Sequence, residues 1–477
     1  MSLSDLAGEP DPLTVVDDAL APAFATADVD ELRSSVHGPV YAAGEDGLAG
    51  EVVSWNLATQ HTPAIAVGAT CGADVAAAVS WAAAHGLRVA VQATGHGPVP
   101  AGADSMLITT RRMQGVRIDP ERRIARVEAG VTWKQLLQTA AEFGLAGPSG
   151  SSSGVGVVGY TLGGGLGPLG RQHGFAADLV TAVEIVTADG RLRRVCAGSE
   201  PELFWAVRGA KSSLGVVTAL EMELVPVADL YAGGIFFSGA DAGPVLHAFR
   251  SWAPTLPEEV STSIAIIRIP DLEFVPDLLR GQTALHLRYT YSGTDLAEGE
   301  RLVAPMRAAG EILLDLIGRI RSTDMDSIHM DPVDPLATWE KGLLLSDVTE
   351  ETVEALLAAA GPQVHLPLVI VELRLMGGQL ARQPEVPNAV PGRGAAFAML
   401  VIGPGAPELA QVVPAAAKGV LGAMQPWKAP EALLNFLGRV SGPQEVAAAY
   451  PLSTVERLRA LKAAVDPAGI FSFGHAL

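Results

Sequence analysis

Residues 147–174 read GPSGSSSGVGVVGYTLGGGLGPLGRQHG, and this stretch decides how the rest of the chain is interpreted. Glycine is too dense here for a regular helix or strand, because each glycine in such an element costs backbone entropy. So many residues without a Cβ are typical of backbone that approaches another group closely. We therefore expect residues 147–174 to form loops that lie against a bound group.

Two short patterns inside this run imitate well-known motifs. GVGVVG at 154–159 matches the GxGxxG of dinucleotide-binding folds, and Asp178 follows at a suitable distance. GSSSG at 150–154 matches the GxSxG of hydrolases, with Ser152 as the nucleophile. Both motifs require a strand before and a helix after, and neither context is expected here. We therefore reject a Rossmann fold and a serine hydrolase.

Regular elements are expected on both sides of the glycine run. DVAAAVSWAAAHG at 74–86 has helical periodicity, and the apolar run LRVAVQA that follows it predicts a strand. TWKQLLQTAAEFG predicts a helix with Thr132 as its N-cap and Gly144 as its stop. LVTAVEIVTADGRLRRV is typical of a hairpin that turns at Asp189 and Gly190.

Beyond about Val227 the pattern changes to longer helices and alternating or apolar strands. GPVLHAFRSWAP and TEETVEALLAAAG predict helices, whereas STSIAIIRIP, TALHLRYTYSG, PLVIVELRLMG and AAFAMLVIG predict strands. This succession indicates an α+β fold in which one antiparallel sheet carries its helices on one face.

Charge and composition narrow the class of protein. Among 477 residues, 52 acidic and 33 basic side chains give a net charge of −19, which disfavours nucleic acid and anionic lipid as partners. No apolar run is long enough for a membrane span, and the acidic start does not resemble a signal peptide, so we expect a cytoplasmic protein. The two cysteines and ten histidines show no metal-ligand spacing, so no metal site is expected.

Six segments together resemble one family. They are TGHG (94–97), SSGVGVVGYTLGGGLG (152–167), LVTAVEIVTADG (179–190), ELFWAVRGAKSSLGVVT (202–218), LLNFLG (433–438) and DPAGIFSFGHAL (466–477). In order and spacing they resemble the berberine-bridge-enzyme-like branch of the vanillyl-alcohol-oxidase flavoproteins, whose PCMH-type FAD-binding domain is built from two parts. The resemblance implies an FAD-binding domain at residues 1–226 and 420–477, and a substrate-binding domain at 227–419.

The resemblance also implies where FAD binds. His96 occupies the family's position for a covalent link to the flavin 8α-methyl carbon, which a neutral imidazole can attack and which raises the reduction potential. If unlinked, His96 would only form hydrogen bonds within its loop. The other residues implied to contact FAD are Gln92, Thr94, Gly95, Gly97, Ser152, Ser153, Gly156, Val157, Gly159, Tyr160, Gly163, Gly164, Val217 and Asn435.

The sequence departs from the family at several positions, including the segment Gln92-Ala93-Thr94, where relatives commonly have arginine and glycine before the loop histidine. Many relatives carry a cysteine at the position of Ser152 that makes a second flavin bond, and a hydroxyl is far less nucleophilic, so we expect a single link through His96. Leu433 stands where relatives often have the tyrosine that abstracts a substrate proton. Lys211 stands where relatives usually have glycine.

A leucine cannot accept a proton, so another base is needed, unless the reaction needs none. Strand alternation places Glu372 and Arg374 on the face opposite the apolar core positions, either in solvent or over the flavin. If Glu372 is buried there, we expect its pKa to rise toward neutrality, which suits a general base. Tyr289 and Tyr291 also share a face, as a second candidate base or as sheet packing.

The resulting expectation is an FAD-dependent oxidase acting in secondary metabolism or on a sugar or alcohol. It would remove a hydride from a C–H next to oxygen or nitrogen of a small molecule and reduce O₂ to hydrogen peroxide. The alternatives are a flavin-dependent oxygenase or dehydrogenase of the same fold, and a flavin-binding protein without turnover. The residues indicate no particular substrate and no oligomeric state.

Overall fold

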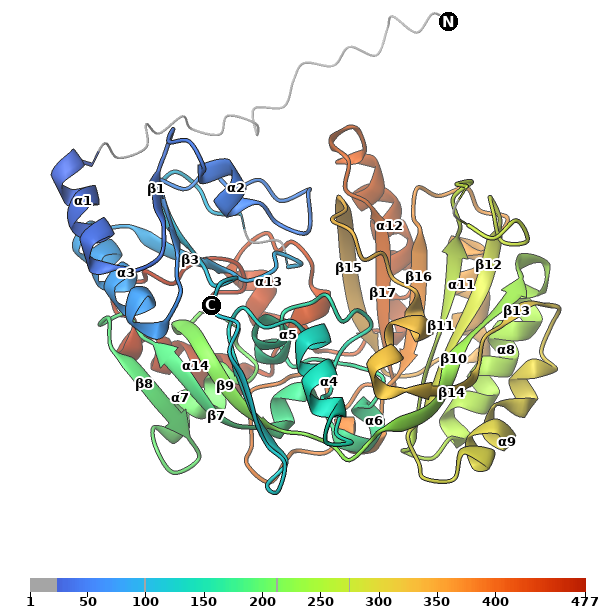
Figure 1. The fold of residues 1–477 in the computed structure, drawn as a ribbon. Coiled ribbons are helices and arrows are strands. Elements are labelled where there is room, and N and C mark those ends of the chain that lie inside the picture. The colour runs from blue at the N-terminus through green and yellow to red at the C-terminus, as the bar shows by residue number, and fades with distance from the viewer. Residues whose placement is uncertain (1–23, 98–99, 212, 274) are drawn as a thin grey trace, which may run out of the picture.

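A computed structural model describes residues 24–97, 100–211, 213–273 and 275–477. Figure 1 shows two lobes, one built from the first half of the chain together with its C-terminal end, and one built from the segment between them. We call these the first lobe and the second lobe. Among the described residues, no helix combines the length and the apolar character that crossing a bilayer requires.

The first lobe contains two sheets. The four-stranded sheet has the order β1-β2-β4-β3, and β2, β4 and β3 run parallel. The five-stranded sheet, of order β5-β6-β9-β7-β8, is antiparallel. The strands are β1 (Val40–Ala42), β2 (Ile65–Gly68), β3 (Arg88–Gln92), β4 (Ser105–Thr109), β5 (Val116–Asp119), β6 (Ile124–Glu128), β7 (Val180–Val186), β8 (Leu192–Cys196) and β9 (Val216–Glu223).

Short helices surround these two sheets. Thr132 caps α4 as expected, because its side chain and that of Gln135 form a reciprocal capping box. The helices are α1 (Thr26–Ser35), α2 (Leu48–Val52), α3 (Gly72–Ala84), α4 (Trp133–Ala141), α5 (Val157–Leu162), α6 (Gly170–His173) and α7 (Pro201–Val207).

The glycine run is more regular than expected, since α5 and α6 both lie inside it. Val157, Val158 and Leu162 are buried in the core of the first lobe, and this packing offsets the low helix propensity of the segment. No strand immediately precedes Val157, so the rejection of a Rossmann motif agrees with the structure.

The second lobe is one eight-stranded antiparallel sheet with the order β13-β10-β12-β11-β16-β17-β15, in which β14 also pairs with β10. The α+β class is thereby confirmed. The strands are β10 (Asp229–Ser238), β11 (Val260–Arg268), β12 (Thr283–Tyr291), β13 (Ile312–Asp315), β14 (Gly318–Arg321), β15 (Thr338–Leu345), β16 (Ile370–Leu375) and β17 (Phe397–Pro404).

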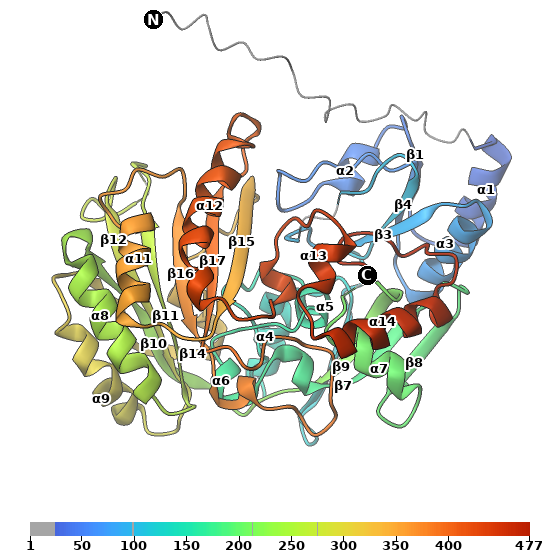
Figure 2. The same ribbon diagram turned by 180° about the vertical axis from the view of Figure 1, so that it is seen from behind.

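Helices cover one face of this sheet, as Figure 2 shows most clearly. They are α8 (Ala242–Trp252), α9 (Leu296–Arg307), α11 (Glu350–Ala360) and α12 (Val412–Ala423). Their apolar side chains pack against those of alternate strand residues to form the largest core cluster of the molecule. The opposite face of the sheet is turned toward the first lobe.

After α12 the chain returns to the first lobe through α13 (Pro443–Ala447) and α14 (Leu452–Val465). The ammonium of Lys462 in α14 donates to the carbonyls of Ser213 and Phe471 and to the carboxylate of Asp466. The boundary expected at 419/420 falls inside α12, whose buried residues belong to the core of the second lobe.

Candidate functional site

The loop that carries His96 follows β3 and is held against residues 54–56. The amides of Trp55 and Asn56 donate to the carbonyls of Thr94 and Gly95, at 3.0 Å each. Gly95 has a φ of +78°, and a Cβ there would lie 2.7 Å from the backbone of Ser54. The loop therefore requires glycine at this position.

His96 presents a neutral imidazole. Its ring stacks on Trp55 with centroids 4.3 Å apart, and Nδ1 lies 2.8 Å from the hydroxyl oxygen of Thr94. Burial lowers the pKa of His96 to about 4. Within the described part of the chain, Nε2 of His96 has no hydrogen-bond partner, so one ring nitrogen is free to react or to bind.

The side chain of Gln92 forms hydrogen bonds with the protein at the start of this loop. Its amide oxygen accepts from the Ser54 hydroxyl at 2.6 Å and lies 2.9 Å from Nε2 of His61, while its nitrogen donates to the carbonyls of Val52 and Val53. Because these contacts use the whole amide, Gln92 positions the His96 loop through the neighbouring chain.

The second expected loop meets the first at Gly156. A Cβ on Gly156 would lie in ordinary contact with Ala93 and Thr94, so the two loops are adjacent. Ser152 is partly exposed near this junction. Ser153 instead donates from its amide and its hydroxyl to the carboxylate of Asp326, which ties the loop to the second lobe.

Tyr160 lies on α5, and its side chain packs closely against several glycine residues. A Cβ on Gly150, Gly165 or Gly167 would come within 3.0 Å of the Tyr160 side chain. The buried hydroxyl of Tyr160 has no hydrogen-bond partner among the described residues, and burial raises its pKa above the usual range. Such an unpaired polar atom indicates that a further group belongs beside it.

Three residues predicted from the sequence, Tyr160, Gly163 and Asn435, lie together near the C-terminal end of α5. Asn435 donates to the carbonyl of Tyr160 at 2.8 Å, and a Cβ on Gly163 would collide with the Asn435 side chain and approach the Lys211 side chain at 2.7 Å. Gly164 has a φ of +104°. Val157 and Val217 are buried in the core of the first lobe, so their side chains support the site from behind.

The structure places Glu372 on the face of the second lobe that is turned toward the first lobe, but it does not leave the carboxylate free. Glu372 accepts from Ser263 at 2.7 Å, from Arg288 at 2.9 Å and from Arg374 at 2.9 Å, and it is 2% exposed. Burial alone would raise its pKa, but the two guanidinium groups outweigh burial and lower it to about 2. The expected rise in the pKa of Glu372 was therefore wrong.

Tyr289 and Tyr291 point away from this face. Both belong to the core beneath α8 and α9, and the hydroxyl of the fully buried Tyr289 donates to the carbonyl of Gly299 at 2.8 Å. The alternation of β12 places His286 and Arg288 on the opposite face instead. Neither tyrosine is therefore positioned as a base, and sheet packing, the alternative reading, describes them.

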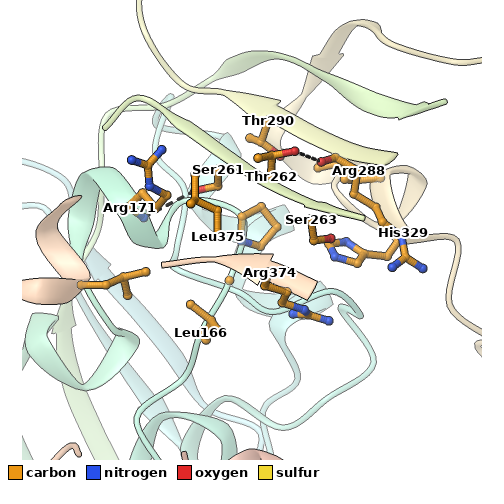
Figure 3. A pocket seen from close by; sticks show the side chains of 14 residues that line it. Leu166, Arg171, Ser261, Thr262, Ser263, Arg288, Thr290, His329, Arg374 and Leu375 are labelled. Atoms are coloured by element: carbon orange, nitrogen blue, oxygen red, sulfur yellow. Dashed lines mark hydrogen bonds between the residues drawn. The ribbon is translucent and has the colours of Figure 1, made fainter. Parts of the chain in front are cut away.

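A pocket lies on the polar face of the sheet, next to Glu372. Figure 3 shows Ser263, Arg288, His329 and Arg374 gathered at one end of this pocket, with Arg171 and Ser261 at the other. His329, on α10 (Asp326–His329), is neutral because burial and the neighbouring arginines lower its pKa well below the usual range. The pocket is thus rich in hydrogen-bond donors.

Comparison with known proteins agrees with this geometry. Residues 63–195 match the family model described as an FAD binding domain. The chain is 32% identical over 245 residues to an FAD-linked oxidoreductase of Dictyostelium discoideum, covering 51% of this chain and 54% of that one. It is 29% identical over 301 residues to (R)-6-hydroxynicotine oxidase of Paenarthrobacter nicotinovorans, covering 61% and 62%.

A solved structure extends the fold similarity to nearly the whole chain. Xylooligosaccharide oxidase from Myceliophthora thermophila, in complex with xylobiose, superposes with a TM-score of 0.80 at 21% identity, covering 94% of this chain and 98% of that one. The chain therefore contains an FAD-binding domain, and the proteins that it resembles are FAD-linked oxidoreductases and oxidases. The aligned parts span between half and two thirds of the two curated relatives.

The residues of the first lobe fit a flavin cofactor. Among the described residues, a Cβ on Gly97, in the His96 loop, or on Gly159, in α5, would meet nothing within 4 Å, so the backbone is open on one side at both positions. The neutral imidazole of His96 and the unpaired hydroxyl of Tyr160 are the polar groups that accompany this open backbone. Glycine backbone, imidazole and phenol suit the phosphates and ring of FAD.

Proposed function

We propose that this chain is an FAD-dependent oxidase that carries FAD on a single covalent link through His96. In this proposal it removes a hydride from a carbon next to oxygen or nitrogen of a small molecule, and the electrons pass to O₂ as hydrogen peroxide. When bound, the flavin supplies the hydride acceptor. The observation that carries the proposal is the neutral His96 imidazole at the junction of the two glycine loops, whose Nε2 has no hydrogen-bond partner among the residues that the structure describes.

The chain's own residues support the parts of this reaction. The His96 loop and the glycine run meet at Gly156 and would hold the cofactor by backbone contacts. The polar face of the second lobe, with Ser263, Arg288 and Arg374, would orient the substrate from the other side. The oxidases of 6-hydroxynicotine and of xylooligosaccharides among the similar proteins support cyclic amines and sugars as substrates.

Acid precipitation tests the covalent link. Trichloroacetic acid should leave the yellow chromophore in the pellet of the wild-type protein and in the supernatant of His96→Ala reconstituted with FAD. Chromophore in the wild-type supernatant would refute the link and leave the flavin fold standing. A colourless wild type that takes up no added FAD would refute the proposed function.

Anaerobic mixing with a panel of cyclic amines, alcohols and oligosaccharides tests turnover. At least one compound should bleach the visible flavin spectrum, and air should restore the colour with one hydrogen peroxide per turnover. Slow recovery in air would identify a dehydrogenase, and incorporation of labelled oxygen into product would identify an oxygenase. A fully coloured protein with every compound would favour a flavin-binding protein without turnover.

A further inference from the structure

Oxidation at a carbon that bears O–H or N–H releases a proton as well as a hydride, so the site needs a proton acceptor. Glu372 is saturated by three donors, and Leu433 is apolar and buried. The acceptor can therefore be another acid on the same face of the second-lobe sheet. Glu340, on β15, is on that face.

Strand register places Glu340 on the face of the sheet that is turned toward the first lobe. Glu340 pairs across to Ile402, and Gly342, the next residue on that face, pairs to Leu400, which in turn pairs with Glu372. The residues on the other side of β15, such as Leu343, pack under the helices. The Glu340 side chain thus shares a face with Glu372.

The end of β15 packs directly against residues 433–438 of the first lobe. A Cβ on Gly438 would collide with the carbonyl of Glu340 and touch its side chain, and a Cβ on Gly342 would crowd Phe436. Glu340 is therefore placed where the two lobes meet, beside the segment that contains Leu433 and Asn435.

The Glu340 carboxylate is half-buried and has no partner within the described residues. It is partly exposed, and it makes no hydrogen bond or ion pair with any residue in the described ranges. Glu372 shows the contrasting state, with three charged or hydroxyl donors on one carboxylate. A half-buried carboxylate without partners is available to bind and take a proton.

Lys211 faces the same region from the first lobe. It has a φ of +53°, which residues other than glycine rarely adopt, and a Cβ built on Gly163 would lie 2.7 Å from its Cε and collide with Asn435. Its ammonium likewise forms no ion pair within 4 Å in the described chain, yet its charge and that of Glu340 influence one another. The backbone strain at Lys211 is consistent with selection for its position rather than for stability.

We propose that the carboxylate of Glu340 is the proton acceptor of this enzyme, and that Lys211 is a positioning residue that favours its anionic form. This inference rests on the proposed function. The substrate O–H or N–H bond breaks and its proton moves to a Glu340 oxygen, while the hydride leaves the adjacent carbon for the flavin. The substrate loses two electrons and becomes a carbonyl compound or an imine, and Glu340 later returns the proton to water.

The electrostatics of the cluster agree with this assignment. Burial raises the pKa of Glu340 to about 7, against the opposing effect of Lys211 and Arg374, and burial lowers the pKa of Lys211 to about 8. Asp331 raises the pKa of Glu340, and His475 lies close enough to Lys211 to interact with it. Glu340 is thus largely anionic above pH 7, so the reaction should accelerate as pH rises through that value.

The rate at which a substrate from the anaerobic panel bleaches the flavin of the holoenzyme, measured by stopped flow, tests the proposal. The wild-type rate should rise with pH around 7, whereas Glu340→Gln should be slower by about 10²-fold or more and lack that rise. Lys211→Met should move the rise upward by about one pH unit. Glu202→Gln, which removes an exposed acid that pairs with Arg457 of α14, should retain the wild-type profile.

A readout without substrate keeps the two proposals separate. Infrared difference spectra of the holoenzyme between pH 5 and 9 should contain a carboxylic acid band that titrates near pH 7, is absent in Glu340→Gln and titrates at higher pH in Lys211→Met. No such band, or a rate profile of Glu340→Gln like that of the wild type, would overturn the assignment while a yellow, bleachable wild type upheld the proposed function.

Discussion

Glu372 illustrates how one residue's neighbours reverse the effect of burial. An isolated buried carboxylate is protonated more easily, but Arg288 and Arg374 stabilise the anion of Glu372 by more than desolvation destabilises it. The sequence placed Glu372 and Arg374 on the correct face, because strand alternation is local. It did not predict the contact with Arg288, which comes from β12, two strands away in the sheet order.

Replacing Glu372 with glutamine should destabilise the protein strongly at neutral pH. Two guanidinium groups would then be buried without a counter-charge, which typically costs about 3–5 kcal/mol. Ser263→Ala, which removes one hydrogen bond to the same carboxylate, should cost only about 1–3 kcal/mol. Urea unfolding at pH 7 measures both differences, and equal midpoints for Glu372→Gln and wild type would contradict the ion-pair account.

The pH dependence of this difference has a definite sign. The folded-state pKa of Glu372 is depressed, so its contribution is complete above the unfolded value of about 4.5 and declines as pH falls toward 2. The urea midpoints of wild type and Glu372→Gln should therefore approach each other as pH falls from 4.5 toward 2.

At the scale of elements, the loop after β3 sterically requires glycine at residue 95. Gly95→Ala should place a Cβ against the backbone of Ser54 at a positive φ, displace His96 and reduce the yield of covalently bound flavin. Gly102→Ala is the matched control, because its Cβ would make only an ordinary contact, 3.5 Å from a carboxylate oxygen of Asp104. The flavin absorbance of acid-precipitated protein measures both, and similar losses in the two variants would argue against the steric account.

Elements were predicted well from sequence where the signal is local. The α4 cap at Thr132, the β7–β8 hairpin and the strands β11, β12, β16 and β17 all follow from periodicity and turn residues. The helix α5 was missed because its glycine content disfavours a helix, and only burial of its valines in the tertiary core stabilises it.

The candidate site was less predictable than its elements. The His96 loop was found because motif and glycine pattern coincide within a few residues. Glu340 was missed, although the alternation in TWEKGLLL separates it from the core positions, because nothing local shows that β15 lies beside residues 433–438. A local sequence pattern does not predict which segments of the two lobes contact each other.

At the scale of the whole molecule, Arg171 joins the two lobes. From α6 it donates to the carbonyl of Met376 at 2.9 Å and to those of Leu256, Pro257 and Val260, all in the second lobe. A single buried guanidinium thus donates to four backbone carbonyls of the other lobe.

Arg171→Met should therefore weaken the union of the lobes, by about 2–4 kcal/mol, since several buried carbonyls would lose their donor. We expect thermal unfolding of the variant, followed by flavin fluorescence and by far-ultraviolet circular dichroism, to separate into two transitions. Arg382→Met removes an exposed arginine that pairs with Glu258 and should change little. Coincident, unshifted transitions in Arg171→Met would contradict this role.

The return of the chain to the first lobe has a consequence for its synthesis. All strands of the second-lobe sheet lie within one continuous segment of the chain, residues 229–404. The first lobe also depends on residues that are synthesised later. Asn435 bonds to Tyr160, Tyr450 to Gly209 and Lys462 to Ser213. The nascent chain can therefore complete its second lobe while the first still lacks these partners. Cofactor insertion then becomes a late event of biogenesis, and a chain released early should not acquire its colour.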